Sequence, residues 1–249
     1  MKINDFMKIN MRKWILVILF FPLIFKAQIL DQYPRGQNFY EGGITKVYND
    51  LHQIIVDQKL KKCADPKELY RLNLLLTKEG DIKFVKDFDT LNIAKNQCAY
   101  DLSKTLAINL KGKKWLPAEV KGQKFSSLVY LMIFPNDLFE KYQSDYNPSR
   151  YFKGSVFKDG QENLTKEIRN TFKSLFSDYN VRGKFYLDFY VDANGEIVSP
   201  SVKPEIENQD FKREVFRTLQ RMNQKWIPAT FHEIPVKSKF SVPLIFTQE

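Results

Sequence analysis

The stretch FKREVFRTLQRMNQKWIPATFHEIPVKSKFSVPLIF, residues 211–246, indicates how the chain is organised. Apolar residues recur at helical spacing in its first part, a Trp-Ile-Pro-Ala turn follows at Trp226, and an alternating strand closes it. Pro228 prevents the helix from continuing beyond the turn. The same order occurs at residues 91–134, where K-W-L-P-A stands at 114–118. Since two of the three tryptophans lie in matching turns, the sequence predicts one type of domain used twice.

A hairpin is predicted directly before this stretch. Residues 184–191 alternate between two faces, with Phe185, Leu187, Phe189 and Val191 on one of them. The turn at 192–195 contains Asn-Gly, which supplies the positive φ values that tight hairpin loops need. The return strand covers residues 196–202. Helical spacing also predicts one helix before the hairpin and one after it, with apolar positions Leu164, Ile168, Phe172 and Leu175, and Phe211, Val215, Leu219 and Met222.

The first half of the chain has the same series of patterns. A helix is predicted from Ile44, a strand over ELYRLNLLL at 68–76, a turn at 77–80 and a short return strand through Ile82 and Phe84. A strand at 125–134 ends the series. The apolar positions of the helix between them are Ala94, Cys98, Leu102 and Leu106.

These features resemble the C-terminal domain of TonB-type energy-transduction proteins. That family begins with a Pro-Gly-Gly-like start, followed by helix, strand, hairpin turn, strand and helix, then a W-x-P turn and a strand with a late Pro and Phe. The resemblance covers residues 157–246. A weaker copy at 39–134 keeps F-Y-E-G-G at 39–43 and the W-x-P turn, but lacks the late proline. The matching segments of the stronger copy are FKDG at 157–160, KFYLDFYVDANGEIVSPSV at 184–202, FKREVFRTL at 211–219, W-I-P at 226–228 and FSVPLIF at 240–246.

The resemblance implies an α+β fold of two tandem TonB-C-terminal-like units, each a three-stranded, mostly antiparallel sheet with two helices on one face. Three departures from the family argue against an energy-transducing role: the chain has no Pro-rich spacer, its leader looks cleavable, and the domain is duplicated. The expected organisation is a signal peptide at 1–27, a short N-terminal segment at 28–38, a degenerate first domain at 39–134, a linker or docked connector at 135–150 and a second domain at 151–249.

The leader and the charge indicate where the chain works. Basic residues precede an apolar run of about 12 residues, shorter than the roughly 17–25 of a membrane span, and Ala27 follows, which is typical of a cleaved signal peptide. The alternative is an uncleaved inner-membrane anchor, with the remainder facing the periplasm in both cases. Residues 1–27 hold five basic residues and one acidic residue, so they carry +4 of the formal charge of +10 and the remaining chain carries +6. That charge is spread along the sequence, which argues against nucleic-acid binding.

The two cysteines, Cys63 and Cys98, both fall in the first half. An even count in an exported chain predicts a disulfide. The alternative is a pair of buried, unpaired thiols that pack as small hydrophobic side chains.

No pattern typical of an enzyme is present. G-x-S-x-G, H-E-x-x-H and P-loop motifs are absent from the sequence, and its two histidines, His52 and His232, fall in different halves. Sequence alone leaves a two-carboxylate hydrolase open. However, the carboxylates at Glu68, Asp87, Asp188 and Glu196 stand at strand ends or on polar strand faces, where we expect them to be solvated. We predict no enzymatic activity, cofactor, metal or small-molecule substrate.

The last strand is the predicted binding element. Pro243 places it at a sheet edge, because proline cannot donate to a ladder, and an edge offers unpaired N–H and C=O groups to another chain. TonB-like domains receive an extended receptor segment beside this strand. Lys237 and Lys239 either protect the edge from aggregation or attract an acidic segment. By the resemblance, the partner-binding residues are Lys237, Ser238, Lys239, Phe240, Ser241 and Val242.

Together these features predict a non-enzymatic periplasmic protein that binds extended segments of envelope proteins by strand addition. An outer-membrane TonB-dependent receptor is the partner that the resemblance suggests, which would link the protein to TonB-dependent transport. The alternative is an envelope-structural or peptidoglycan-associated protein without a transport role.

Overall fold

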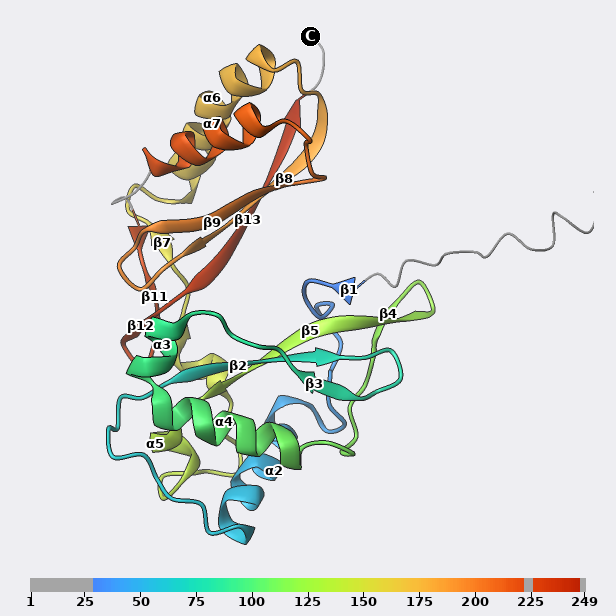
Figure 1. The fold of residues 1–249 in the computed structure, drawn as a ribbon, viewed down its shortest axis with the longest axis vertical. Helices are drawn as coiled ribbons and strands as arrows, with labels where there is room; N and C mark the ends of the chain where they lie inside the picture. The colour runs from blue at the N-terminus through green and yellow to red at the C-terminus, as the bar shows by residue number, and fades with distance from the viewer. Residues whose placement is uncertain (1–28, 222–225, 247–249) are drawn as a thin grey trace, which may run out of the picture. The chain divides into compact units, whose positions relative to one another are not determined.

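The chain folds as two units, with the boundary between Tyr146 and Asn147 (Figure 1). The computed structural model describes residues 29–221 and 226–246, and it has the α+β class that the sequence predicts. The predicted signal peptide at 1–27 and the predicted helix position Met222 lie outside the described residues. None of the described helices combines the length and the apolar character needed to cross a bilayer.

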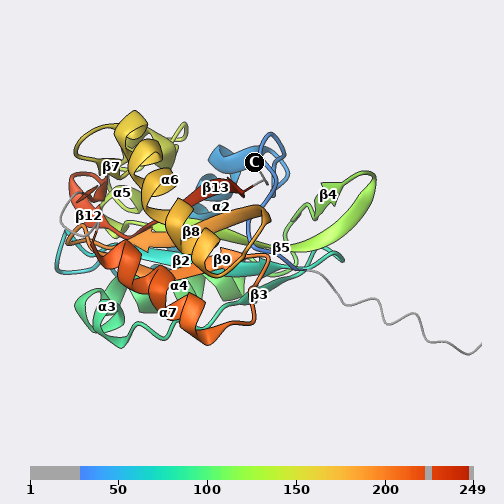
Figure 2. The same cartoon turned by 90° about the horizontal axis from the view of Figure 1, so that it is seen from above.

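The first unit is built on one mixed sheet with strand order β1-β5-β2-β3, in which β4 also pairs with β5. The three predicted strands are present as β2, β3 and β5. The expectation of a three-stranded sheet is wrong here, because β1 and β4 both pair with β5. The β4–β5 hairpin extends from the body of this unit in both views (Figures 1 and 2). The elements are β1 (Ile29–Leu30), α2 (Gly43–Asp57), β2 (Tyr70–Leu76), β3 (Ile82–Phe84), α3 (Thr90–Lys95), α4 (Gln97–Asn109), β4 (Ala118–Val120), β5 (Gln123–Ile133) and α5 (Pro135–Leu138).

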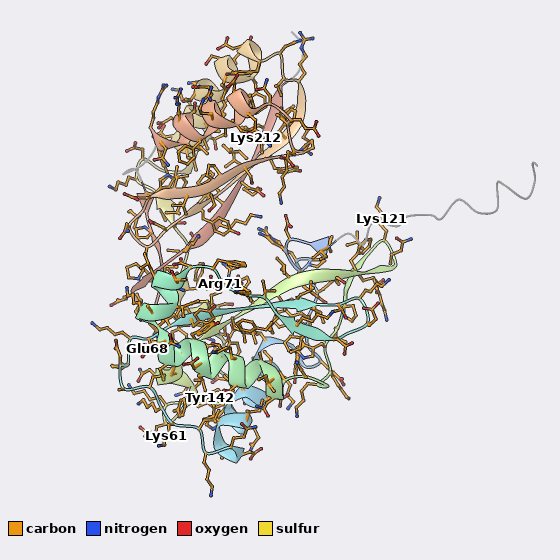
Figure 3. The ribbon with its side chains drawn as sticks, viewed as in Figure 1. Lys61, Glu68, Arg71, Lys121, Tyr142 and Lys212 are labelled. Carbon is orange, nitrogen blue, oxygen red and sulfur yellow. A yellow bond between two sulfur atoms is a disulfide. The ribbon has the colours of Figure 1, made fainter. Side chains whose placement is uncertain are left out.

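Alternation along β2 explains how this sheet is covered. Its even-numbered residues from Tyr70 to Leu76 are buried and its odd-numbered ones are half-buried, so one face packs against the helices. Figure 1 shows α2 and α4 on that side of the sheet. On the other face, the guanidinium carbon of Arg71 lies 4.1 Å from the ring centroid of Tyr130 (Figure 3). The buried residues of α2 are Val47, Tyr48, Leu51, Ile54 and Ile55.

The helix predicted around Ala94 and Cys98 is broken. Asn96, with φ −125° and ψ 39°, separates α3 from α4, and its buried side-chain oxygen accepts a hydrogen bond from the Leu69 N–H at 3.0 Å. The Asn96 side-chain amide also donates to the Asn92 carbonyl at 3.0 Å, and an asparagine side chain that bonds to nearby backbone in this way competes with helical hydrogen bonding. Ala94 is therefore exposed rather than part of an apolar stripe.

Much of the predicted connector at 135–150 packs onto the first unit. Leu138 is fully buried, Tyr142 stacks on His52 with centroids 4.2 Å apart, and the Ser144 carbonyl accepts from the Asn49 amide at 3.1 Å. Residues up to Tyr146 thus belong to this unit. Of the two alternatives for this segment, the structure shows the docked connector rather than a free linker.

The second unit contains an antiparallel sheet of three strands in the order β13-β8-β9. Figures 1 and 2 show α6 and α7 side by side on one face of this sheet. Shorter strands form two further small sheets, β10-β7 and β12-β11-β6. The elements are η1 (Pro148–Tyr151), β6 (Phe152–Lys153), β7 (Val156–Phe157), α6 (Gln161–Asp178), β8 (Gly183–Val191), β9 (Ile197–Lys203), α7 (Gln209–Gln220), β10 (Trp226–Ile227), β11 (Ala229–Phe231), β12 (Ile234–Val236) and β13 (Ser238–Phe246).

The core of the second unit is rich in aromatic side chains. Phe176 of α6 meets Phe211 of α7 edge-on at 5.1 Å between centroids. Phe189 of β8 and the buried Trp226 lie 5.6 Å apart. Such pairs stabilise by about 0.5–1.5 kcal/mol each beyond their area burial, so the packed face of the sheet is well determined.

Each unit brings a tryptophan against a hairpin glycine. In the first, Trp115 forms an isolated antiparallel bridge with Tyr40, and a Cβ on Gly80 would lie 3.3 Å from the Trp115 carbonyl oxygen. In the second, Trp226 pairs with Phe157, and a Cβ on Gly195 would lie only 2.6 Å from the Trp226 oxygen. Both glycines have positive φ, 91° and 82°.

Substituting these glycines should reveal how closely the backbones approach. Gly195→Ala should lower the free energy of unfolding of the second unit by about 2–3 kcal/mol, and Gly80→Ala that of the first by about 1–2 kcal/mol. Both changes force alanine into the left-handed backbone conformation. Only at position 195 does the added Cβ also collide with a backbone atom, the Trp226 carbonyl oxygen. Native-state hydrogen exchange measures the two units separately; equal losses would contradict the described approach at Gly195.

In the structure, Cys63 and Cys98 form a disulfide with their Cα atoms 5.7 Å apart, and it joins the segment before β2 to α4 across a sequence separation of 35. Closing a loop of this length restricts the unfolded chain, which stabilises by about 3–4 kcal/mol in the chain-entropy model. Both sulfurs lie within the first unit.

Replacing both cysteines, Cys63→Ser with Cys98→Ser, should therefore destabilise the first unit by up to about 3–4 kcal/mol. Hydrogen exchange of core amides in β2 should accelerate, while amides in β8 keep their rates. Equal acceleration in the two strands would show that the crosslink does not act locally.

Candidate binding edge

Strand β13 lies at one end of its sheet. It pairs along its whole length with β8, from Ser238 opposite Val191 to Phe246 opposite Gly183. On its other side it pairs with no strand among the described residues. Strand β13 is therefore the long edge of the second unit, and it carries five of the six predicted partner-binding residues.

The chain reaches this edge through a tight hairpin. After Trp226, β11 and β12 pair antiparallel with Phe231 opposite Ile234, and the turn residues His232 and Glu233 both have positive φ, 46° and 65°. Such a two-residue turn matches the natural twist of the flanking strands. The hairpin fixes the point at which Lys237 and the start of β13 follow.

Alternate side chains of β13 face the core. Phe240 stacks on Phe189 with centroids 5.7 Å apart and lies 4.6 Å from Trp226. Ser238 is buried, and its hydroxyl contacts that of Ser155. The side chains of Ser238, Phe240 and Val242 thus face the core and hold the strand in place. They do not point toward a partner segment that binds beside the strand.

Two of the other three predicted residues, Lys239 and Ser241, meet a buried carboxylate. Asp188 of β8 accepts a hydrogen bond from the Ser241 hydroxyl at 2.6 Å and lies 3.2 Å from the Lys239 ammonium and 3.6 Å from that of Lys203. Asp188 is only 7% exposed, so the expectation of a solvated carboxylate is wrong here. The positive charge of Lys239 is therefore paired with Asp188 within the sheet. The exposed Lys237 instead lies over the ring of Tyr190 at 5.1 Å.

Pro243 indicates which backbone groups face outward. Proline has no N–H, and within sheets it is found where the nitrogen faces away from the ladder. Because strand residues alternate sides, the N–H and C=O groups of Lys239 and Ser241 then also point away from β8, whereas those of Val242 point toward it. The outward polar backbone runs from Lys237 to Ser241 and loses its donor at Pro243.

The corresponding edge in the first unit is largely occupied. On β5, Met132 donates its N–H to the Tyr48 hydroxyl and accepts that hydroxyl's hydrogen on its C=O, both at 2.9 Å. Burial raises the pKa of the Tyr48 phenol above its usual range, so the hydroxyl keeps the proton that it donates. Strand β1 pairs with the same side of β5, parallel, at Ser126 and Ser127.

Sequence reasoning missed these contacts. From the sequence, Tyr48 has no role beyond the helix predicted from Ile44, and Ile29-Leu30 has none beyond the short N-terminal segment. The available signals were a hydroxyl in an otherwise apolar helix face, which needs a partner when buried, and two adjacent apolar residues beyond the leader.

The histidines have structural partners in their own units. The Leu138 carbonyl can only accept, so the His52 Nδ1 carries the hydrogen of their 2.8 Å contact. His232 stacks on Tyr151 at 4.1 Å. Two shallow hollows lie on the outer face of α6, and their polar lining includes Asn163, Lys166 and Asn170.

The remaining carboxylates also have structural partners or are exposed. Glu68 accepts from the Ala99 N–H at 3.0 Å, and Asp87 accepts from the Tyr70 hydroxyl at 2.9 Å; Glu196 is exposed. Cys63, Cys98 and Glu68 lie within ligand distance of one another, but the two sulfurs form the disulfide and so provide no thiolate for a metal.

Removing the buried carboxylate should weaken the edge strand. Asp188→Ala should cost the second unit about 1–3 kcal/mol, because a charged acceptor for Ser241 and Lys239 is lost. Lys203→Ala should cost under about 1 kcal/mol, since this lysine is half-exposed and its ion pair is screened. Urea unfolding measures both; equal losses would contradict the central position of Asp188.

Comparison with known proteins adds no relative. No family model matches the chain, and neither a curated protein nor a solved structure matches it.

Proposed function

We propose that this is a non-enzymatic periplasmic protein in which two TonB-C-terminal-like domains stand in tandem, and in which the second binds an extended segment of an envelope protein. The segment adds as a strand to the outer side of β13. An outer-membrane TonB-dependent receptor is the partner class suggested by the sequence resemblance, with a role linked to transport.

The open side of β13 is the observation that carries this proposal. From Lys237 to Ser241, the outward backbone pairs with no described strand, and unpaired N–H and C=O groups at an edge bind another chain's backbone. The strand itself is held firmly by Asp188 and by the aromatic core around Phe240. A rigid edge of this kind loses little conformational freedom when a segment binds.

Matching sheet geometry supports the tandem arrangement. In both units, the last strand lies beside the first long strand, and the hairpin return strand lies beyond it, as β5-β2-β3 and as β13-β8-β9. The same backbone hydrogen bonds close the two hairpins. They are Thr77 N–H to Asp81 O at 2.7 Å and Gly80 N–H to Thr77 O at 3.0 Å, and Asp192 N–H to Glu196 O at 2.9 Å and Gly195 N–H to Asp192 O at 3.1 Å.

Matching helix ends and turns support it further. Helices α2 and α6 both end with a left-handed residue, Lys59 at φ 50° and Asn180 at φ 51°, inside the same pair of C-terminal hydrogen bonds. The hairpin after each tryptophan turn also has two positive-φ residues, at Lys121-Gly122 (Figure 3) and at His232-Glu233.

Proline at position 241 tests the edge. Ser241→Pro removes an outward N–H and leaves the ladder to β8 intact, whereas Val242→Pro would damage that ladder. With the full chain as bait and detergent-solubilised envelope as the source, the proposal predicts capture of outer-membrane receptors that carry N-terminal extended segments. Synthetic peptides of those segments should bind Ser241→Pro at least tenfold more weakly than the unmodified chain.

Ser241→Ala is the matched control, because it removes the hydroxyl that contacts Asp188 and keeps the N–H. It should bind the peptides within about twofold of the unmodified chain. Equal binding by the proline variant, with its core hydrogen exchange intact, would refute strand addition at β13. Co-sedimentation with purified peptidoglycan and no receptor capture would support the structural alternative instead.

A further inference from the structure

In the first unit, β1 lies where a partner segment would bind in the second. Ser127 of β5 stands opposite Leu76, the last residue of β2, and Ser238 stands opposite Val191, the last residue of β8. Ser126 and Ser127 therefore correspond to Lys237 and Ser238. On the outer side of β5, Ile29 pairs with Ser126 and Leu30 with Ser127, in parallel orientation.

One further contact closes the far end of this edge. The Tyr48 hydroxyl satisfies both backbone groups of Met132. Met132 stands opposite Arg71 as Pro243 stands opposite Tyr186. Between β1 and Tyr48, the outward backbone groups without a strand partner among the described residues are the Leu128 C=O and those of Tyr130.

The β1 contact is small, while the chain that follows it is well anchored. The Tyr33 hydroxyl lies 2.9 Å from the carbonyl oxygens of both Asn38 and Leu116. The Gln37 side-chain amide donates to the Glu119 C=O at 2.7 Å and accepts from its N–H at 3.1 Å. By contrast, β1 has two residues, and Ile29 is 49% exposed. The contacts of Tyr33 and Gln37 keep β1 close to the edge of β5. Because β1 itself is so short, few contacts are broken when it detaches from β5.

We infer that β1 is an intramolecular occupant of the first unit's acceptor edge, so that the second unit alone is open to partners until β1 is displaced. This inference rests on the proposed function, since it assigns β1, a strand of the same chain, the place that a partner's strand would take. Displacing β1 would expose a second acceptor edge and change the binding stoichiometry from one segment per chain to two.

Leu30→Pro in the full chain tests this occupancy without any partner. Leu30 stands opposite Ser127, whose backbone groups face β2, so in a parallel ladder Leu30 is the residue that bonds across to β5. The variant should speed exchange of the Leu128 amide, which donates to the Leu30 carbonyl in such a ladder, about tenfold. Leu30→Ala keeps the N–H and should leave this rate within about twofold. An unchanged rate in Leu30→Pro would overturn the inference.

A peptide of residues 28–34, QILDQYP, then tests whether the edge accepts a strand from outside. At millimolar concentration it should restore the slow exchange of the Leu128 amide in Leu30→Pro. No restoration would overturn the acceptor role of this edge. Slow exchange of residues 70–76 in every variant shows that the unit stays folded.

Stoichiometry separates this inference from the proposed function. A receptor segment that binds the unmodified chain one to one should bind Leu30→Pro two to one, and adding Ser241→Pro should return the ratio to one. A ratio of one in Leu30→Pro, with its edge shown to be open, would overturn the inference while strand addition at β13 stands. Failure of every segment to bind β13, with exchange responding to Leu30→Pro, would refute the proposed function instead.

Discussion

The close approach of a tryptophan carbonyl to a hairpin glycine sets the geometry of each unit. The chain leaves its second main helix, passes the hairpin turn at Gly80 or Gly195 with almost no spare room, and only then starts its last long strand. This packing fixes where β5 and β13 begin. The position of the candidate binding edge thus depends on this backbone contact as much as on the strand's own sequence.

Periodicity predicted most of the regular structure. The alternation at residues 184–191 and the helical spacing of Leu164, Ile168 and Phe172 correspond to β8 and α6. Pro243 correctly placed β13 at a sheet edge. These patterns are local. A proline has no N–H, so the residue type alone indicates a position where the strand nitrogen does not bond to a neighbouring strand. That the two units are copies of a TonB-C-terminal-like domain stays a prediction.

Sequence failed where the outcome depends on partners distant in the chain. The burial of Asp188 follows from the register that brings Lys239 and Ser241 across from it. The break at Asn96 follows from an acceptor that meets the Leu69 N–H. Strand β1 and the Tyr48 contact likewise join segments about 84 to 97 residues apart, a separation at which pattern reading has no information.

Closing one of the two edges has a consequence for how such a chain folds. Neighbouring domains that both expose a long bare strand are present at high local concentration, and such strands pair with each other during folding, which leads to misassembly and fibrous aggregates. The Tyr48 hydroxyl at Met132 ends the stretch of unpaired outward backbone on β5, and the missing N–H at Pro243 ends that on β13. In the first unit, β1 shortens the unpaired stretch further. The same contacts that make the units unequal therefore also shorten the unpaired strand edge that the described part of the chain presents while it folds.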